Sequence, residues 1–446
     1  MSTQSLRSIF LPVAGVLATA LLIAGCGDSF FGVDNPGQIQ EADLNSEEAL
    51  EAVVTGMSSD LTAELDQIAF AGARLSDEMS STGSYFITGR ARRGIIEDDD
   101  VNTYWEGIQR ARFSAESGIE RMRNVLGENF GDRKELGARA LLFAGLTNRV
   151  YGENFNRVVF EGGEAQSRTA AFERAIPFLE SAESVAETAG ADDIVNAARG
   201  GLAQVYMNLG NWSEARSYAE QVPTDFVYNA LYSRNSGREE NEVFDETHER
   251  YEMSAIETLA GEVGGPDDPR VPYTDCRGNV DGGTCTAENG AGGNNPHLRQ
   301  EKYQSLGDDI PLVKGTEMRL IEAEAALRGE GGPDFATFAA QINEVRSFHE
   351  LAPIEQPTEL GELEHPISTD DGDALSILDR ERHLTLWLEA RRLNDLTRWD
   401  HPFLDGGALA YTSNIASKRA SIMPVAESEC DNNENVECPP QAVYTP

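Results

Sequence analysis

The side chains best suited to hold a ligand lie in the loop-like stretch Ser76–Asp100. Its aromatic and arginine residues are Tyr85, Phe86, Arg90, Arg92 and Arg93. Aromatic faces combined with guanidinium groups suit sugar rings, aromatic groups or carboxylates. We therefore expect the two aromatic residues, Arg90 and Arg92 to contact a ligand. The alternative is that the arginines only neutralise the acidic run Glu97–Asp100 nearby.

A second set of candidates lies in the middle of the chain, at Asp225–Asn295. This stretch is rich in Gly, Asn, Asp and Tyr, which is the composition of loops with short strands. A long structured insert in a compact body is usually functional. We therefore expect ligand contacts from Tyr228, Tyr232, Arg234 and Tyr251. For each of these residues alone, ordinary loop packing is the alternative.

Motifs of catalytic chemistry are missing from the sequence. The six histidines are isolated, and there is no H-E-x-x-H, no G-x-S-x-G, no Walker loop and no G-x-G-x-x-G that opens a helix. With 76 acidic residues, close Asp/Glu pairs arise by chance and are weak evidence for acid–base catalysis. We therefore expect a protein that is not an enzyme and that needs no cofactor.

The excess of acidic residues gives the chain a net charge of −40. Such a surface repels phosphate backbones, which argues against nucleic-acid binding. The runs Asp98–Asp100 and Asp431–Glu434 could bind calcium, but they lack the spacing of an EF-hand. Solvated acidic runs are the simpler interpretation, so we expect no metal site.

The N-terminus has the features of an export signal. A single basic residue, Arg7, precedes the apolar run Ile9–Ile23, which Pro12 interrupts and which is too short to span a membrane comfortably. The sequence Ile-Ala-Gly before Cys26 resembles a bacterial lipobox, which implies cleavage before Cys26 and acylation of that residue. Several acyl chains would give durable anchoring. Residues 1–25 would then be the signal peptide and 26–44 a lipidated tether; an ordinary signal peptide with an incidental Cys is the alternative.

The other four cysteines fall into two local pairs, Cys276 with Cys285 and Cys430 with Cys438. Each pair lies in a Gly- or Asn-rich loop of an exported protein, so a disulfide within each pair is the natural interpretation. These bonds would close short loops and stabilise the loops more than the fold. Other pairings stay open, whereas a zinc site built from all four is disfavoured because neither pair has two-to-four-residue spacing.

Apolar residues at helical spacing predict that most of the chain is α-helical. The predicted helices are Asn45–Asp66, Asn102–Leu126, Lys134–Tyr151, Ala170–Ala189, Thr316–Leu327 and Phe335–Phe348. Between them, Ala198–Pro223 matches the spacing of a tetratricopeptide helix pair. In that pair Tyr206 and Trp212 would fill the wedge between two helices, and Gly210 would supply a left-handed turn.

A further helix is predicted at Asp373–Trp399, because this stretch contains no Gly or Pro and is rich in Leu, Ala, Glu and Arg. Its apolar stripe carries charges, namely Glu381, Arg382, Glu389, Arg391 and Arg392. Charges placed there must be paired, because a lone buried ion costs several kcal/mol. We therefore expect a central helix whose charged side chains tie neighbouring segments together. A solvated face with surface ion pairs is the alternative.

The same stretch resembles the late signature of SusD/RagB-type nutrient-uptake lipoproteins. The matching positions are Ile377, Glu381, Arg382, Leu384, Glu389, Arg391, Asp395, Leu396, Arg398 and Trp399. His383 and Ala390 depart from the Glu/Arg and Gly that are usual in the family, which should be tolerable changes on a packing helix. Asp268–Asp275, Glu301–Leu327 and the Met423–Val425 motif also resemble family segments.

This resemblance implies a mostly α, SusD-like fold with tetratricopeptide-type helix pairs plus a long loop-rich insert with short strands. The expected regions are an N-terminal helical repeat region at 45–224, the insert at 225–300 and a C-terminal region at 301–446. Family members are non-catalytic outer-membrane lipoproteins that face the outside of the cell. They bind an extracellular glycan or other nutrient and deliver it to a SusC-like TonB-dependent β-barrel. The alternative is a helical-repeat envelope lipoprotein that acts as a protein–protein scaffold.

Overall fold

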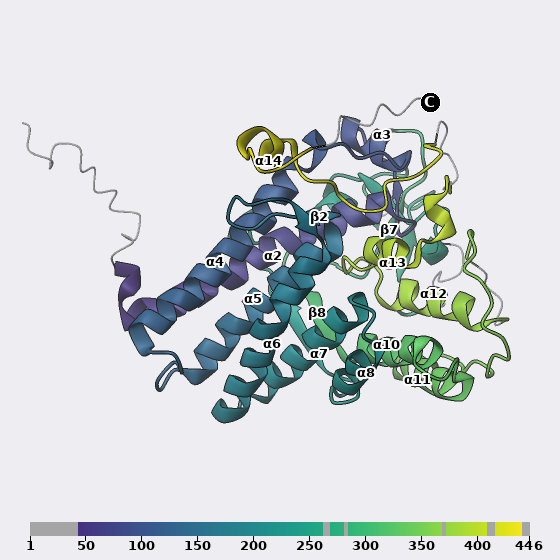
Figure 1. Ribbon diagram of the computed structural model, residues 1–446. Helices are drawn as coiled ribbons and strands as arrows, with labels where there is room; N and C mark the ends of the chain where they lie inside the picture. The colour runs from purple at the N-terminus through teal and green to yellow at the C-terminus, as the bar shows by residue number, and fades with distance from the viewer. Residues whose placement is uncertain (1–42, 262–267, 281–283, 368–371, 408–414, 439–446) are drawn as a thin grey trace, which may run out of the picture. The chain divides into compact units, whose positions relative to one another are not determined.

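Long helices packed side by side form the framework of the protein (Figure 1). A computed structural model describes residues 43–261, 268–280, 284–367, 372–407 and 415–438. The expected signal peptide and Cys26 lie outside the described residues. Residues 43–49 contain the short 3-10 helices η2 (Asp43–Asn45) and η3 (Glu47–Ala49) and form a unit of their own. Within the described ranges, no helix is both long enough and apolar enough to cross a membrane.

The N-terminal helices are α2 (Leu50–Leu75), α4 (Asn102–Leu126), α5 (Lys134–Asn154) and α6 (Thr169–Ala189). Helix α2 packs against α4 and α5, and α5 packs along α6. The helix α2 reaches Leu75 rather than the predicted Asp66. Its last turns, from Ile68 onward, are buried on all sides, so the sequence there has no polar face from which a helix could be recognised.

The predicted tetratricopeptide pair consists of α7 (Asp192–Asn208) and α8 (Trp212–Ala219). Gly210 lies in the turn between them with φ +74°, as predicted. Tyr206 stacks on Tyr218 with ring centroids 5.7 Å apart. Helix α8 packs on α10 (Gly315–Arg328), which pairs with α11 (Phe335–Phe348). Figure 1 shows α4, α5, α6 and α7 in succession, which confirms the mostly α fold with helix pairs.

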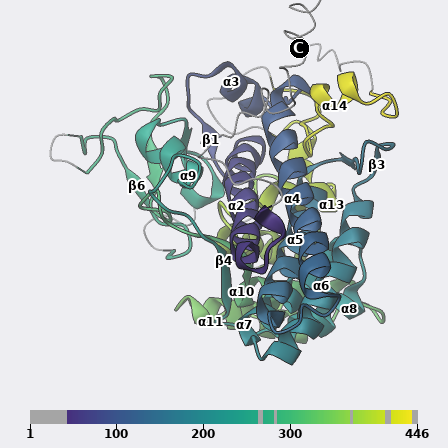
Figure 2. The same cartoon turned by 90° about the vertical axis from the view of Figure 1, so that its left-hand side faces the viewer.

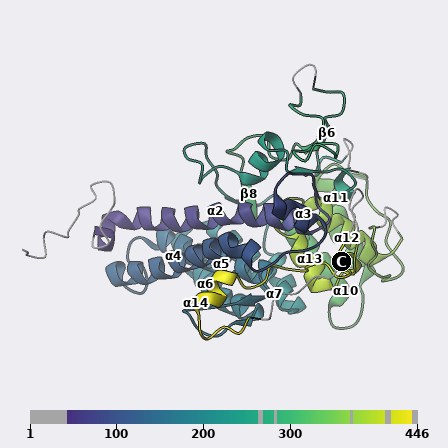
Figure 3. The ribbon, with the colours of Figure 1, turned by 90° about the horizontal axis from the view of Figure 1, so that it is seen from above.

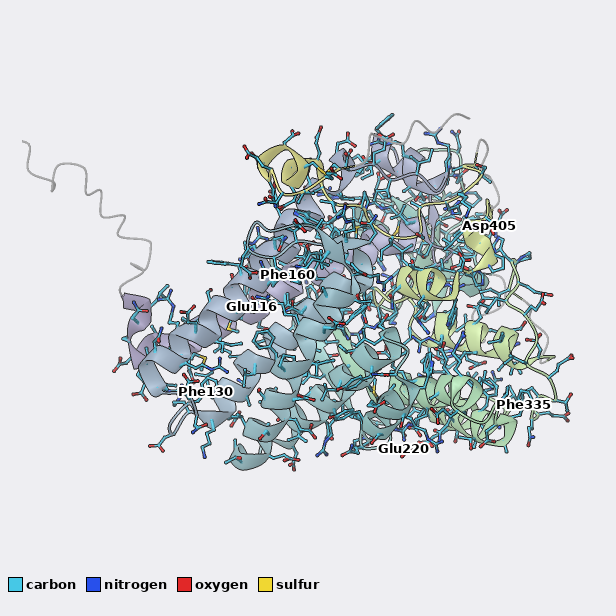
Figure 4. All side chains as sticks on the ribbon, viewed as in Figure 1. Glu116, Phe130, Phe160, Glu220, Phe335 and Asp405 are labelled. Carbon is cyan, nitrogen blue, oxygen red and sulfur yellow. A yellow bond between two sulfur atoms is a disulfide. The ribbon has the colours of Figure 1, made fainter. Side chains whose placement is uncertain are left out.

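A cluster on the surface joins α4 to α6 and the loop that follows α5. Glu116, labelled in Figure 4, accepts hydrogen bonds from Arg112 at 3.0 Å and from Arg174 at 2.6 Å. The ring of Phe160 lies under both guanidiniums, with centroid distances of 5.3 Å and 4.6 Å respectively. These contacts join neighbouring helices through one buried guanidinium, Arg112, which is 7% exposed, and one partly exposed guanidinium, Arg174.

The strands are short and pair in twos, always antiparallel. They are β1 (Ser80–Ser81) with β5 (Met253–Ser254), β2 (Arg157–Val158) with β3 (Gln166–Ser167), β4 (Val227–Ala230) with β8 (Ile310–Lys314), and β6 (Tyr273–Asp275) with β7 (Leu298–Gln300). Four of these eight strands, β4 to β7, belong to the expected loop-rich insert, which also holds α9 (Glu242–Phe244) and the π-helical turn η5 (Asp245–Glu249). Figures 2 and 3 show β6 on the opposite side of α2 from α6.

The prediction of one continuous helix over Asp373–Trp399 is wrong. The chain forms α12 (Ala374–Thr385) and α13 (Arg392–Trp399), and between them Leu388 and Ala390 each have φ +60°. The cause is tertiary: the Glu78 carboxylate accepts the Leu388 N–H at 2.8 Å, which competes with the helical hydrogen bond. The family's usual residue at this position is Gly, which adopts φ +60° without strain. Ala390 is therefore not the tolerable change on a packing helix that the sequence suggested.

The charged residues of this stretch are buried and tie distant segments together. Glu381 accepts hydrogen bonds at 2.6 Å from Arg270, in the insert, and at 2.6 Å from Arg346, on α11. Arg382 donates to Asp395 at 2.8 Å and 3.0 Å. The side chains of Glu381, Arg382 and Asp395 are at most 2% exposed, so the solvated face considered above does not exist here.

The second half of the stretch continues the pattern. Glu389 accepts from Lys302 and Lys314, each at 2.6 Å, and Arg391 donates to Glu317 at 3.2 Å. Trp399 donates its indole N–H to Glu324, which also pairs with Arg398. The remaining short helices are α3 (Phe86–Arg92), η4 (Asp99–Val101), η8 (Pro402–Leu404) and α14 (Glu427–Asn432).

Candidate functional site

Strand pairing between β1 and β5 brings two of the predicted ligand-contact regions together. Ser80 pairs with Ser254 and Ser81 with Met253, and Thr82, which follows β1, donates its N–H to the Glu252 carbonyl at 2.9 Å. Gly292, also in the insert, donates to the Thr82 carbonyl at 2.9 Å. The stretch expected to be loop-like therefore lies against the insert, and it contains the seven-residue helix α3.

A pocket of about 400 Å³ opens where this stretch turns into α3. Its lining residues are Ser81, Gly83, Ser84, Tyr85, Phe86, Thr88, Gly89, Arg92 and Arg93. Tyr85 is 44% exposed and Phe86 is 77% exposed, so both rings are available to a ligand. Large aromatic side chains are usually more deeply buried, because leaving them in water forfeits about 1.5–3 kcal/mol. The pocket thus combines exposed aromatic faces with hydroxyl and guanidinium donors.

A buried carboxylate from the insert holds this pocket in shape. Glu252 is 2% exposed and accepts hydrogen bonds from the Ser84 N–H at 3.2 Å and the Thr88 hydroxyl at 3.0 Å. A Cβ on Gly83 would lie 1.5 Å from Glu252 Oε2, so only glycine leaves room for the carboxylate. Sequence reasoning missed Glu252, because nothing in its local sequence distinguishes it from the many other acidic residues.

The arginines of α3 divide between the two roles considered for them. Arg90 contacts Glu97, Asp99 and Asp100, and its side chain is only 11% exposed. It therefore neutralises the acidic run. Arg92 and Arg93 line the pocket instead, and the Nε of Arg93 donates to the Gly89 carbonyl at 3.2 Å.

Among the insert candidates, Tyr251 contacts this stretch but does not line the pocket: its carbonyl accepts a hydrogen bond from the Thr82 hydroxyl at 3.4 Å. Its carbonyl accepts the Ala291 N–H at 2.9 Å, and its ring meets that of His297 edge to face at 5.5 Å. The neighbouring Arg250 donates to the Tyr85 hydroxyl at 3.1 Å, which links the insert to the pocket rim.

The other insert candidates are not part of the pocket lining. Tyr232 is 7% exposed and donates its hydroxyl to the Thr62 carbonyl at 2.9 Å, so it is a core residue. Tyr228 lies on β4, where burial raises its pKa to about 12. Arg234 is exposed, and its side chain lies near Gly307.

The structure contains the disulfides Cys276–Cys285 and Cys430–Cys438. Their Cα–Cα distances are 5.6 Å and 5.9 Å, within the usual range for disulfides. Each bond closes a local loop, one in the insert and one that runs from Cys430 in α14 to Cys438.

Comparison with known proteins identifies the scaffold. Residues 294–440 match the SusD family model. The fold is similar to that of a SusD superfamily protein from Bacteroides fragilis, with a TM-score of 0.62 and 14% identity over 88% of this chain and 99% of the other. Residues 294–440 therefore match the SusD family, and the chain as a whole has a SusD-like fold. No curated protein is significantly similar to it in sequence.

Two further structures show how well the SusD-like fold is retained. A laminarin-binding SusD-like protein covers 88% of this chain and 98% of its own, with 14% identity and a TM-score of 0.56. B. fragilis NanU covers 92% and 100%, with 13% identity and a TM-score of 0.62. The residues that match the SusD family model include α12 and α13, whereas the pocket residues around Tyr85 lie outside them. The comparisons therefore identify the framework and not the ligand.

Proposed function

We propose that this protein is a non-catalytic nutrient-binding member of the SusD/RagB family whose ligand is a glycan or oligosaccharide. The observation that carries the proposal is the pair of exposed rings, Tyr85 and Phe86, at the rim of a pocket in a SusD-like fold. Aromatic faces bind the apolar faces of sugar rings, and Arg92 can donate hydrogen bonds to sugar hydroxyls. The laminarin-binding neighbour supports this ligand class.

The composition of the pocket supports binding rather than catalysis. Its described lining residues are Gly, Ser, Thr, Tyr, Phe and Arg, so they offer no Asp, Glu, His or Cys as a general base or nucleophile. The nearby Glu252 carboxylate is already engaged by Ser84 and Thr88. A rigid loop of this kind can hold a ligand without making or breaking a bond.

The proposal places the protein on the outer membrane, anchored through acylated Cys26 and exposed to the outside. Its partner is a SusC-like TonB-dependent β-barrel, to which it delivers the bound nutrient. Support comes from the lipobox-like sequence before Cys26 and from the family's usual role. The net charge of −40 disfavours nucleic acid as a ligand. Affinity purification from outer membranes in mild detergent tests the partner: a co-purifying barrel supports delivery, and envelope-assembly proteins alone would support a scaffold.

Calorimetric titration of the soluble chain from Ser29 onward, against a panel of glycans and peptides, tests the ligand class. We expect Tyr85→Ala and Phe86→Ala each to weaken glycan binding by about 3- to 10-fold, because an aromatic contact contributes about 0.5–1.5 kcal/mol. The melting temperature should not fall, since both rings are exposed. The matched control is Phe113→Ala, which removes a ring that is 68% exposed on α4. Unchanged affinity in both pocket variants would remove this pocket from the binding site.

A further inference from the structure

Three carboxylates converge where α9 passes into the π-helical turn η5. Oxygen atoms of Glu242, Asp245 and Glu246 all lie within 4.8 Å of one another. The spacing i, i+3 and i+4 places the three side chains on one face of the helix. The turn is fixed at its start, because the Asn241 side chain accepts the Phe244 N–H at 3.0 Å.

One of these carboxylates has an oxygen without a partner. Glu246 is 3% exposed, and its Oε2 makes no hydrogen bond. Leaving a buried charged oxygen unsatisfied is costly. This buried oxygen therefore lacks a donor or positive charge that would compensate its burial.

Arg250 supplies only part of that charge. Its Nε lies 2.8 Å from Asp245, its Nη1 lies 3.4 Å from Glu246, and its side chain is 51% exposed. When all three carboxylates are ionised, they and the one guanidinium carry a formal charge of −2. The next nearby acid, Glu252, is already engaged at the pocket.

In a second acidic cluster within the described residues, a guanidinium contacts every carboxylate. Oxygen atoms of Glu97, Asp99 and Asp100 also lie within 4.8 Å of one another. Arg90 contacts all three carboxylates, and its side chain is only 11% exposed. In that cluster a buried guanidinium already occupies the position that a cation would take. At Glu246 an oxygen has no such partner.

We propose that Glu242, Asp245 and Glu246 form a binding site for a divalent cation of the calcium type. Hard cations prefer carboxylate oxygens, and calcium accepts irregular geometry in which water completes six to eight ligands. Water can reach the site, because Glu242 and Asp245 are only partly buried. A charge of +2 balances the formal −2 of the cluster with Arg250. Calcium sites in extracellular modules have dissociation constants of about 10⁻⁴–10⁻³ M, and we expect that range here.

The test uses the full chain in mild detergent, after a chelator has removed bound metal from the protein. The buffer contains about 0.15 M salt, so that weak binding of cations to the exposed surface is screened. Terbium luminescence, excited through a nearby tyrosine, reports whether the site is occupied. Tyr85 can serve as that tyrosine, because Arg250 contacts both the carboxylate cluster and the Tyr85 hydroxyl. Calcium chloride should displace terbium. Calorimetric titration with calcium chloride gives the affinity, and magnesium chloride tests selectivity for the larger ion.

Glu246→Gln keeps the shape of the side chain and removes its charge, so calcium affinity should fall at least 10-fold. Glu242→Gln, at a partly buried position, tests the same site in case the first variant does not fold. The matched control is Glu97→Gln in the Arg90 cluster, which should leave calcium binding unchanged. The proposal is overturned if calcium does not bind the parent chain, if both cluster variants bind it normally, or if Glu97→Gln weakens it equally.

Discussion

Replacing Arg392 by Met tests whether buried ion pairs hold the two halves of the fold together. Arg392 on α13 is 1% exposed at its side chain, and it donates to Asp77 at 2.6 Å and 2.7 Å. Its Nη1 donates to Asp379 on α12. Asp77 follows α2, so this guanidinium joins the N-terminal helices to the C-terminal ones. Methionine has a similar length but no charge and no donor.

The expected cost is about 3–5 kcal/mol of unfolding free energy at neutral pH, because removing one partner leaves buried charge unpaired. Asp77 and Asp379 both lose their guanidinium here, although Asp379 keeps His401 at 3.0 Å, so we expect a cost within that range. A cost of this size is a large fraction of the 5–15 kcal/mol by which a domain is stable. The melting temperature should fall by roughly 5 °C, because an unfolding entropy of about 2.1 cal/mol/K per residue makes each kcal/mol correspond to little more than about 1 °C in a body of this size.

The cost should also depend on pH. Burial raises the pKa of Asp77 and Asp379, but Arg392 lowers both below their ordinary value. In the parent chain these groups therefore contribute stability above pH about 4, which is lost as the pH falls further. Without Arg392, burial alone raises their folded pKa values above the unfolded ones. The variant should then lose stability as the pH rises, so its deficit should be larger at pH 8 than at pH 5.

Urea unfolding followed by circular dichroism at both pH values measures this. The matched control is Arg216→Met, whose partner Glu220 is labelled in Figure 4; the two side chains are 46% and 47% exposed. An exposed pair contributes about 0–1 kcal/mol, so this variant should be nearly neutral. If Arg392→Met costs no more than Arg216→Met, or if its deficit shrinks from pH 5 to pH 8, the reasoning about buried pairs is refuted.

Three further predictions follow from the same contacts. Glu252→Gln should weaken glycan binding by about 10-fold, because a hydrogen bond to a charged group contributes about 1.5–3 kcal/mol; equal affinity in titrations would contradict its positioning role. Cys276→Ser together with Cys285→Ser should leave the melting temperature nearly unchanged and speed proteolysis within the insert, since the bond spans only nine residues; a large loss of melting temperature would contradict this. Burial raises the pKa of Asp395, but the opposing effect of Arg382 is larger and the net pKa is about 2. Urea midpoints should therefore fall as the pH drops from about 4 towards 2, and midpoints that do not change over this range would contradict the pairing.

The sequence predicted the amphipathic helices well and the fully buried ones less well. Helix α4 begins and ends where the spacing of apolar residues predicted, at Asn102 and Leu126. The end of α2 was missed because its last turns have no polar face. The break before α13 was missed because its cause, the Glu78 carboxylate, lies about three hundred residues earlier in the chain.

The candidate site was predictable only in part, for the same reason. Exposed Tyr85 and Phe86 could be named from residue type, and both line the pocket. The support from Glu252 depends on β1–β5 pairing between segments far apart in sequence, which no local pattern reports. Tyr232 illustrates the opposite error, because a tyrosine in a loop-rich stretch can equally fill the core.

The burial of the central ion pairs has a consequence for the stability of the folded chain in concentrated salt. Dissolved ions shield exposed charges beyond roughly 10 Å at 0.1 M but scarcely reach pairs such as Arg382 with Asp395, whose side chains are at most 2% exposed. The chain has 76 acidic and 36 basic residues in all, and the mutual repulsion of the acidic residues that are exposed is, by contrast, open to shielding. Concentrated sodium chloride should therefore reduce the repulsion between exposed carboxylates without weakening the buried ion pairs. The folded chain should be more stable at high salt than at low salt.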